Sequence, residues 1–138
     1  MAVLVDTGPL VAILRDEDQY HDVCLRALTE IHEPLVSCWA VITESAWILR
    51  RHPKAIEKLL LGSNGSFLTL APMSGAEAIP IAEIMNRYAG LHPQLADATL
   101  VYLAGREKID TIFTLDRRDF LVYRTARRGS FRLIPDPR

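Results

Sequence analysis

The sequence is poor in cysteine, the residue that marks many small secreted domains. Its 138 residues include only two cysteines, Cys24 and Cys38, which give no basis for a disulfide framework. We expect both to be reduced core thiols of a cytoplasmic protein. The apolar start of the chain lacks a basic leader and is interrupted by Asp6, so we expect neither a signal peptide nor a membrane span.

Several motifs of phosphate and metal chemistry are missing as well. There is no Gly-x-x-x-x-Gly-Lys run, which argues against a phosphate-loop enzyme. Phosphatases of the haloacid-dehalogenase type need a second aspartate two residues after the first, and the residue two positions after Asp6 is Gly8. The four histidines show no ligand spacing, so we interpret them as surface residues and do not expect structural zinc.

No internal repeat, low-complexity stretch or linker divides the chain, and we interpret residues 1–138 as a single domain. Short apolar segments alternate with longer helical ones. We expect strands at 2–6, 35–38, 66–70, 111–115 and 130–134, and helices at 9–15, 18–32, 39–51, 53–61, 74–89 and 93–107. This alternation predicts an α/β fold, in which a short and mostly parallel sheet is covered by helices on both faces.

Charge is unevenly distributed along the chain. Residues 1–100 contain 7 basic and 12 acidic groups, whereas residues 101–138 contain 9 and 5. The basic excess consists mainly of arginines, at positions 117, 118, 124, 127, 128, 132 and 138. Guanidinium groups suit phosphate contacts through paired donors, although a solvated, loop-rich surface is the alternative interpretation.

Four acidic residues occupy positions that the pattern predicts to be partly buried: Asp6, Glu44, Asp97 and Asp116. Asp6 and Asp116 each follow a short apolar strand, and in parallel sheets the functional crevice lies beyond the carboxyl ends of the strands. Carboxylates that are buried together repel one another and lose hydration, so they need a cation or protons. If the fold brings them together, they predict a divalent-metal site and metal-assisted hydrolysis of a phosphodiester.

Each of these acids has a structural alternative. Asp6 can cap the helix that begins after it, unless Thr7 does so and leaves Asp6 free to face the crevice. Glu44 can be an exposed helical residue, and Asp116 can cap a short turn. Asp97 has an ion pair as its remaining alternative, because a helix that starts near Pro93 would place it a full turn inside, too deep to cap.

An all-oxygen cluster suits Mg²⁺ or Mn²⁺. Three threonines near the acids, Thr7, Thr43 and Thr114, are either ordinary strand-end and helix residues or groups that orient carboxylates and metal-bound water. Asp119 is either a fifth, outer carboxylate or a surface partner of the neighbouring arginines. Trp39 and Trp47 lie on the helix of Glu44, where core packing is the default and a dimer interface the alternative.

Four segments, taken in order, resemble a known family. They are Val5-Asp6-Thr7-Gly8-Pro9-Leu10, Thr43-Glu44, Leu95-Ala96-Asp97-Ala98 and Thr114-Leu115-Asp116-Arg117-Arg118-Asp119-Phe120. With these segments the whole chain resembles PIN-domain ribonucleases, and specifically the VapC toxins of toxin–antitoxin pairs. The resemblance implies a PIN-like three-layer α/β/α fold with a short central, mostly parallel sheet.

The resemblance also implies roles for individual residues. Asp6, Glu44, Asp97 and Asp116 would be the catalytic acids of the metal site. We expect Asp6, Asp97 and Asp116 to hold one or two Mg²⁺ or Mn²⁺ ions, and Glu44 either to complete the metal shell or to orient the attacking water. Asp119 would be an accessory residue. From their positions beside the acids, rather than from the resemblance, we expect Thr7 and Thr114 to be accessory residues as well. From the chemistry of their side chains we expect four arginines to contact the RNA backbone: Arg117, Arg118, Arg127 and Arg128.

The expected activity is endonucleolytic cleavage of structured RNA, of the transfer or ribosomal type, by a cytoplasmic homodimer without membrane association. A small VapB-like antitoxin would neutralise it by filling the crevice with its tail. The alternative is a non-catalytic PIN-like module that binds RNA or a partner protein.

Overall fold

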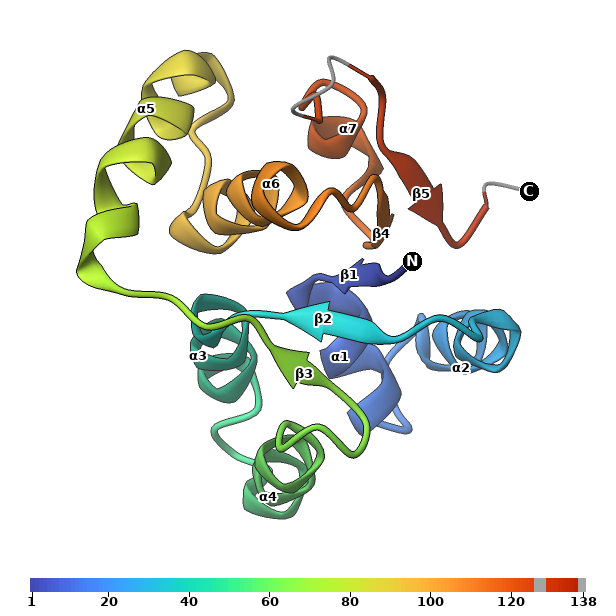
Figure 1. The fold of residues 1–138 in the computed structure, drawn as a ribbon. Helices are drawn as coiled ribbons and strands as arrows, with labels where there is room; N and C mark the ends of the chain where they lie inside the picture. Colours follow the sequence, from blue (N-terminus) through green and yellow to red (C-terminus); the bar gives the residue numbers. More distant parts are fainter. Residues whose placement is uncertain (126–128, 137–138) are drawn as a thin grey trace.

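Five parallel strands form one sheet in the order β3-β2-β1-β4-β5 (Figure 1). The structure is a computed structural model that describes residues 1–125 and 129–136. The strands are β1 (Val3–Val5), β2 (Leu35–Ser37), β3 (Thr69–Leu70), β4 (Thr111–Phe113) and β5 (Arg132–Ile134). The α/β prediction is therefore confirmed. In the described residues every strand pairing of the sheet is parallel.

Helices cover both faces of this sheet. The order of the strands reverses after β3, because β4 pairs on the far side of β1. Connections that run in opposite directions along a parallel sheet place their helices on opposite faces. Figure 1 accordingly shows the helices that precede β3 on one side of the sheet, and the two long helices between β3 and β4 on the other. They are α1 (Thr7–Leu14), α2 (His21–Glu30), α3 (Trp39–Ile48), α4 (Pro53–Gly62), α5 (Ala78–Arg87) and α6 (Leu95–Glu107).

The core lies around the two central strands. All three residues of β1 and all three of β4 are buried, as expected for parallel strands that are covered on both faces. The edge strands are shorter or more polar, since β3 has two residues and β5 begins with the exposed Arg132. Among the described helices, none is long and apolar enough to cross a lipid bilayer.

The start of α6 differs from the prediction. His92 adopts a left-handed conformation with φ of 52°, and the helix begins only at Leu95, after Gln94. The sequence pattern placed this start near Pro93, so the expectation that Asp97 lies a full turn inside the helix was wrong, although Asp97 is not the N-cap residue. Asp97 is the third residue of α6, where a negative charge interacts favourably with the helix dipole.

Other boundaries moved by a few residues. The predicted helix 18–32 begins at His21, and the predicted helix 39–51 ends at Ile48. The predicted helix 74–89 is a short 3₁₀ turn followed by α5, and a capping box between Ser74 and Glu77 begins the turn. A second 3₁₀ turn precedes His92. The segment after β4, for which no helix was predicted, contains a short helix, α7 (Arg117–Phe120), which Asp116 caps.

The two tryptophans of α3 are not in the core. Trp39 is 61% exposed and Trp47 is 66% exposed, so the default of core packing was wrong. Val41, Ile42 and Ser45 form the buried face of this helix. The two tryptophans are eight residues apart and share the solvent face, which a single sequence cannot distinguish from the core face when both carry apolar residues.

Candidate functional site

An acidic cleft of about 490 Å³ lies at the carboxyl ends of β1 and β4. This is the point where the strand order reverses, and such points are the usual ligand sites of open α/β sheets. The cleft contains all four predicted acids together with Asp119 and a sixth carboxylate: Asp6, Asp18, Glu44, Asp97, Asp116 and Asp119. The prediction that the fold brings the four acids together is confirmed.

Asp6 both caps α1 and belongs to the cleft. Its Oδ1 accepts a hydrogen bond from the backbone N–H of Thr7 at 2.8 Å, and its Oδ2 accepts one from the hydroxyl of Thr114 at 2.7 Å. The side chain is almost fully buried, with 6% of its residue surface exposed. The two interpretations of Asp6 are therefore compatible, since one oxygen serves the cap while the residue still lines the cleft.

Threonine hydroxyls connect the acids from different elements. Thr7 donates its hydroxyl hydrogen bond to Oε1 of Glu44, and this bond joins α1 to α3. Thr114 accepts the backbone N–H of Asp116 at 3.0 Å while it donates to Asp6. Thr43 takes no part, because its hydroxyl is bonded to the carbonyl of Trp39.

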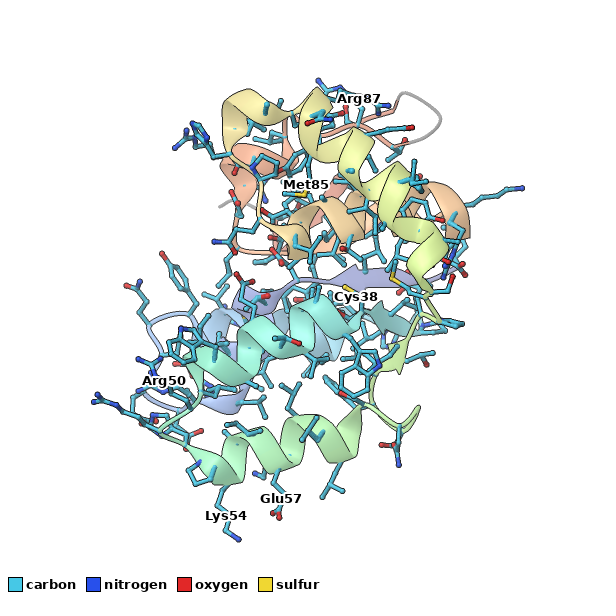
Figure 2. All side chains as sticks on the ribbon, turned by 90° about the vertical axis from the view of Figure 1, so that its left-hand side faces the viewer. Cys38, Arg50, Lys54, Glu57, Met85 and Arg87 are labelled. Atoms are coloured by element: carbon cyan, nitrogen blue, oxygen red, sulfur yellow. The ribbon has the colours of Figure 1, made fainter. Side chains whose placement is uncertain are left out.

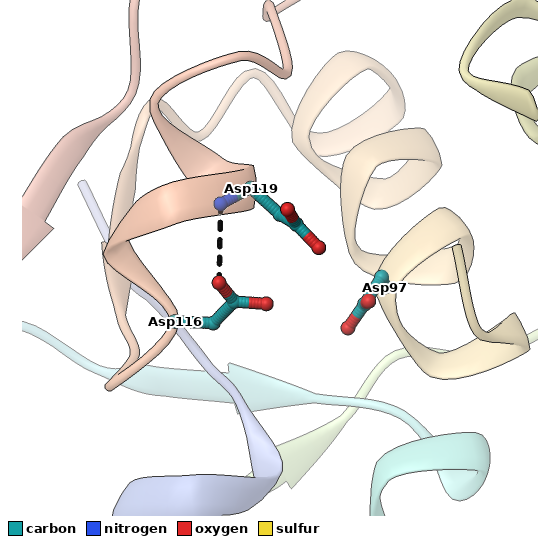
Figure 3. Close-up of side chains that lie close together, drawn as sticks. All are labelled: Asp97, Asp116 and Asp119. Atoms are coloured by element: carbon teal, nitrogen blue, oxygen red, sulfur yellow. Dashed lines mark hydrogen bonds between the residues drawn. The ribbon is translucent and has the colours of Figure 1, made fainter. Parts of the chain in front are cut away.

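Three carboxylates form the tightest cluster of the cleft. Asp97, Asp116 and Asp119 each offer one oxygen, and these oxygens lie within 4.8 Å of one another (Figure 3). Asp116 also accepts the backbone N–H of Asp119 at 3.1 Å, the bond drawn in Figure 3, which caps α7. Like Asp6, Asp116 therefore caps a helix and also lines the cleft.

The cleft has a strong excess of negative charge. The pKa of Asp97 is raised to about 7, first by burial and then by the charges of Asp6, Asp116 and Glu44. The pKa of Asp6 is raised to about 6, again chiefly by burial, although the hydrogen bonds from Thr114 and Thr7 oppose the shift. In the part of the chain that the structure describes, no lysine or arginine lines the cleft, and Asp97 has no ion-pair partner.

These residues fit a divalent cation. All the clustered donors are carboxylate oxygens, the ligand type that Mg²⁺ and Mn²⁺ prefer, and among the described residues no lysine or arginine lines the cleft to neutralise them. The ion-pair alternative for Asp97 finds no partner among the described residues. Asp119 is in the cluster of three and Asp6 is not, so direct metal ligation by Asp6 stays a prediction.

Of the four arginines that were predicted to contact RNA, the two in the described residues, Arg117 and Arg118, do not line the cleft. Arg117 donates from Nη1 to the carbonyl of Pro135 at 2.9 Å, and Arg118 is exposed, with its Nε 3.8 Å from Oδ1 of Asp119. Arg124 donates to three backbone carbonyls of its own loop. Arg127 and Arg128 lie outside the described residues.

Sequence reasoning missed three polar residues of the cleft: Asp18, His92 and Gln94. Asp18 lies in the turn before α2, where its side chain accepts the N–H of Tyr20 at 2.8 Å. A turn aspartate of this kind has a sufficient local role, so nothing in the sequence indicates that it lies in the cleft. His92 and Gln94 carried no signal, since only the left-handed turn before α6 directs this segment to the cleft.

Comparison with known proteins agrees with the geometry. The family model described as PIN domain matches residues 3–128. Ribonuclease VapC26 of Mycobacterium tuberculosis is 29% identical over 135 residues, which cover 96% of this chain and all of that protein.

A solved structure gives independent support for the fold. The crystal structure of VapC20 of Mycobacterium tuberculosis, described as a sarcin-ricin loop cleaving toxin, superposes with a TM-score of 0.77. The match covers 84% of this chain and 91% of that one, at 15% identity. Strand order, cleft position and sequence match therefore agree, and this chain belongs to the PIN domain family.

Proposed function

We propose that this protein is a metal-dependent endoribonuclease and the toxin of a toxin–antitoxin pair. The observation that carries the proposal is the cluster of Asp97, Asp116 and Asp119, with oxygens within 4.8 Å of one another in a cleft that none of the described lysines and arginines lines. The similarity to Ribonuclease VapC26 along almost the whole chain supports the same activity.

The three clustered aspartates would hold Mg²⁺ or Mn²⁺, with Asp6 beside them. A bound divalent ion in such a site lowers the pKa of water and stabilises negative charge on the scissile phosphate. Glu44 is held by Thr7 through Oε1, and its Oε2 has no hydrogen-bond partner among the described residues. This oxygen is free to orient the attacking water.

The proposed substrate is a structured RNA of the transfer or ribosomal type, cleaved in the cytoplasm. The description of VapC20 as a sarcin-ricin loop cleaving toxin supports a structured target. A VapB-like antitoxin would enter the cleft and satisfy its carboxylates with basic side chains, because a negative cleft attracts positive groups. We also propose a homodimer.

The decisive experiment is incubation of total cellular RNA with purified protein and Mg²⁺ or Mn²⁺. Discrete fragments are expected, and they should be absent with chelator and with Asp97→Asn. Glu83→Gln is a matched control, since Glu83 is exposed on α5 and does not line the cleft. If folded wild-type protein gives no fragments, or if Asp97→Asn gives the same ones, the non-catalytic binding module becomes the better interpretation.

A further inference from the structure

The carboxyl-terminal end of α3 carries an exposed aromatic ring with a cation fixed against it. Trp47 is 66% exposed, and the guanidinium carbon of Arg50 lies 4.1 Å from the centroid of its ring. Nη1 of Arg50 also donates to the carbonyl of Trp47 at 2.9 Å. This bond holds the guanidinium beside the ring, so that the two side chains form a preorganised cation–π pair. Figure 2 labels Arg50 at this end of α3.

Further cations surround this pair. Residues 50–58 contain four lysines and arginines and a single acid, and all four cations are exposed: Arg50, Arg51, Lys54 and Lys58. The first hundred residues contain only seven basic groups, so more than half of them lie here. Among the described residues, Arg50 and Arg51 form no ion pair, and Lys54 has only Glu57 at 4.0 Å. We call Trp47, Arg50, Arg51 and Lys54 the basic corner.

The basic corner borders the acidic cleft. Glu44 and Ile48 of the same helix line the cleft, and Ile48 is 45% exposed. Trp47 follows Glu44 by three residues, which makes the two side chains neighbours on the helix surface, about 4.5 Å apart along the axis. A ligand that lies on the basic corner can therefore extend directly into the cleft.

We propose that the basic corner is the docking surface for RNA, and this inference rests on the proposed nuclease function. An unstacked base packs on Trp47, and the adjoining phosphates contact Arg50, Arg51 and Lys54. Aromatic faces accept bases of any sequence, and exposed cations supply most of the affinity for the backbone. The acidic cleft by itself repels a polyanion, so a positive surface at its edge is needed to bring RNA to it.

The docking surface selects single-stranded segments. Bases inside a duplex are stacked on both faces and present no free face to Trp47. The chemistry of the surface therefore predicts that a loop or a single strand binds to it better than a duplex of the same length.

The other end of α3 has a different character. Trp39 lines an apolar groove of about 350 Å³ with Met73, Met85 and Leu95, and in the described part of the chain no lysine or arginine lines it. Trp39 is 61% exposed on the same helix, so it differs from Trp47 mainly in the absence of adjacent cations. Trp39→Ala is therefore a matched control for Trp47→Ala.

The test measures binding of a fluorescein-labelled oligouridylate of about 12 nucleotides, long enough to span the corner and the cleft. Fluorescence anisotropy is recorded with the full chain in EDTA, so that binding is separated from cleavage. Trp47→Ala should weaken binding about tenfold, whereas Trp39→Ala should change it less than about twofold. Arg50→Ala should reduce the slope of log affinity against log salt by about 0.7.

Equal affinities of the two tryptophan variants, each shown to be folded by circular dichroism, overturn the proposal. An RNA duplex that competes as well as the single strand overturns the role of base stacking. A Trp47→Ala protein with unchanged RNA affinity but an altered mass in light scattering assigns the corner to a second copy of the chain instead.

A cleavage assay on the same preparations separates the two proposals. If Trp47→Ala and Trp39→Ala cleave RNA equally well in the presence of metal, the proposed nuclease function is supported and the proposed docking surface is contradicted. If the wild-type protein cleaves no RNA but Trp47→Ala still loses RNA binding, the docking surface is supported and the nuclease function is contradicted.

Discussion

The hydroxyl of Thr114 donates a 2.7 Å hydrogen bond to Oδ2 of Asp6, although the two residues are 108 positions apart. Thr114 is fully buried at the end of β4, and Asp6 follows the adjacent strand β1. The same hydroxyl oxygen accepts the N–H of Asp116. A single threonine thus aligns the acids of the two central strands.

Thr114→Val should disturb the site more than the fold. Valine has nearly the same shape but cannot donate to Asp6, so the pKa of Asp6, already raised to about 6, should rise further. We expect a loss of stability of about 1 to 3 kcal/mol, because two buried polar groups lose their partner. Carboxyl NMR titration measures the pKa. Thr43→Val is the control, since Thr43 is exposed and bonds only within α3, and an equal pKa shift in that variant would contradict the assignment.

Asp97 should make the metal-free protein less stable as pH rises. Its pKa is about 7 in the folded protein and 3.8 ordinarily, so between these values unfolding releases a proton and becomes easier. The loss of unfolding free energy that ionisation of Asp97 causes is absent below about pH 4 and complete above about pH 7. Since the residue is partly exposed, we expect about 1 to 2 kcal/mol after allowance for solvent screening.

Urea unfolding in EDTA at several pH values tests this expectation. Asp97→Asn should be more stable than wild type near pH 8 and equal to it near pH 4. Glu83→Gln should keep the wild-type profile. A lower stability of Asp97→Asn at every pH would instead indicate that the carboxylate has a structural partner.

Mg²⁺ or Mn²⁺ should stabilise the folded protein. Binding at a concentration one hundred times the Kd adds about 2.7 kcal/mol. The melting temperature should rise with either ion. Asp119→Asn should weaken the metal affinity about tenfold or more, because loss of a residue that only supports a ligand already costs about that much affinity. Asp110→Asn is the control, because Asp110 lies before β4, outside the cleft. Equal metal-induced shifts in both variants would exclude Asp119 from the site.

Arg117→Ala should act on stability and not on RNA affinity. The guanidinium of Arg117 donates to the carbonyl of Pro135 and thereby connects α7 to the segment after β5. Its loss should cost about 1 kcal/mol in thermal or urea unfolding. Arg118→Ala, which removes an exposed side chain, should change stability by less than about 0.5 kcal/mol. If Arg117→Ala binds the labelled oligouridylate more weakly than wild type, the original prediction that Arg117 contacts RNA is supported instead.

The sequence by itself determined the order of the strands and of the longer helices along the chain, and it identified the candidate acids. Apolar runs of three to five residues that end in aspartate indicate buried parallel strands with a polar edge, and this signal is local. It was sufficient for Asp6 and Asp116, each of which also proved to be a helix cap. The capping box at Ser74 and Glu77 was predictable for the same reason, because its two partners are three residues apart.

Only the tertiary structure decided which of these groups meet, and which side chains remain free. The bond of Thr7 to Glu44 and that of Thr114 to Asp6 join residues far apart in the chain, so no local pattern contains them. The arginine excess after residue 100 suggested an RNA contact. Folding turned Arg117 toward a carbonyl, while Arg50 was placed on an exposed ring beside the cleft. Charge is a property of the sequence, but the availability of a charge depends on the partners that packing brings within hydrogen-bond distance.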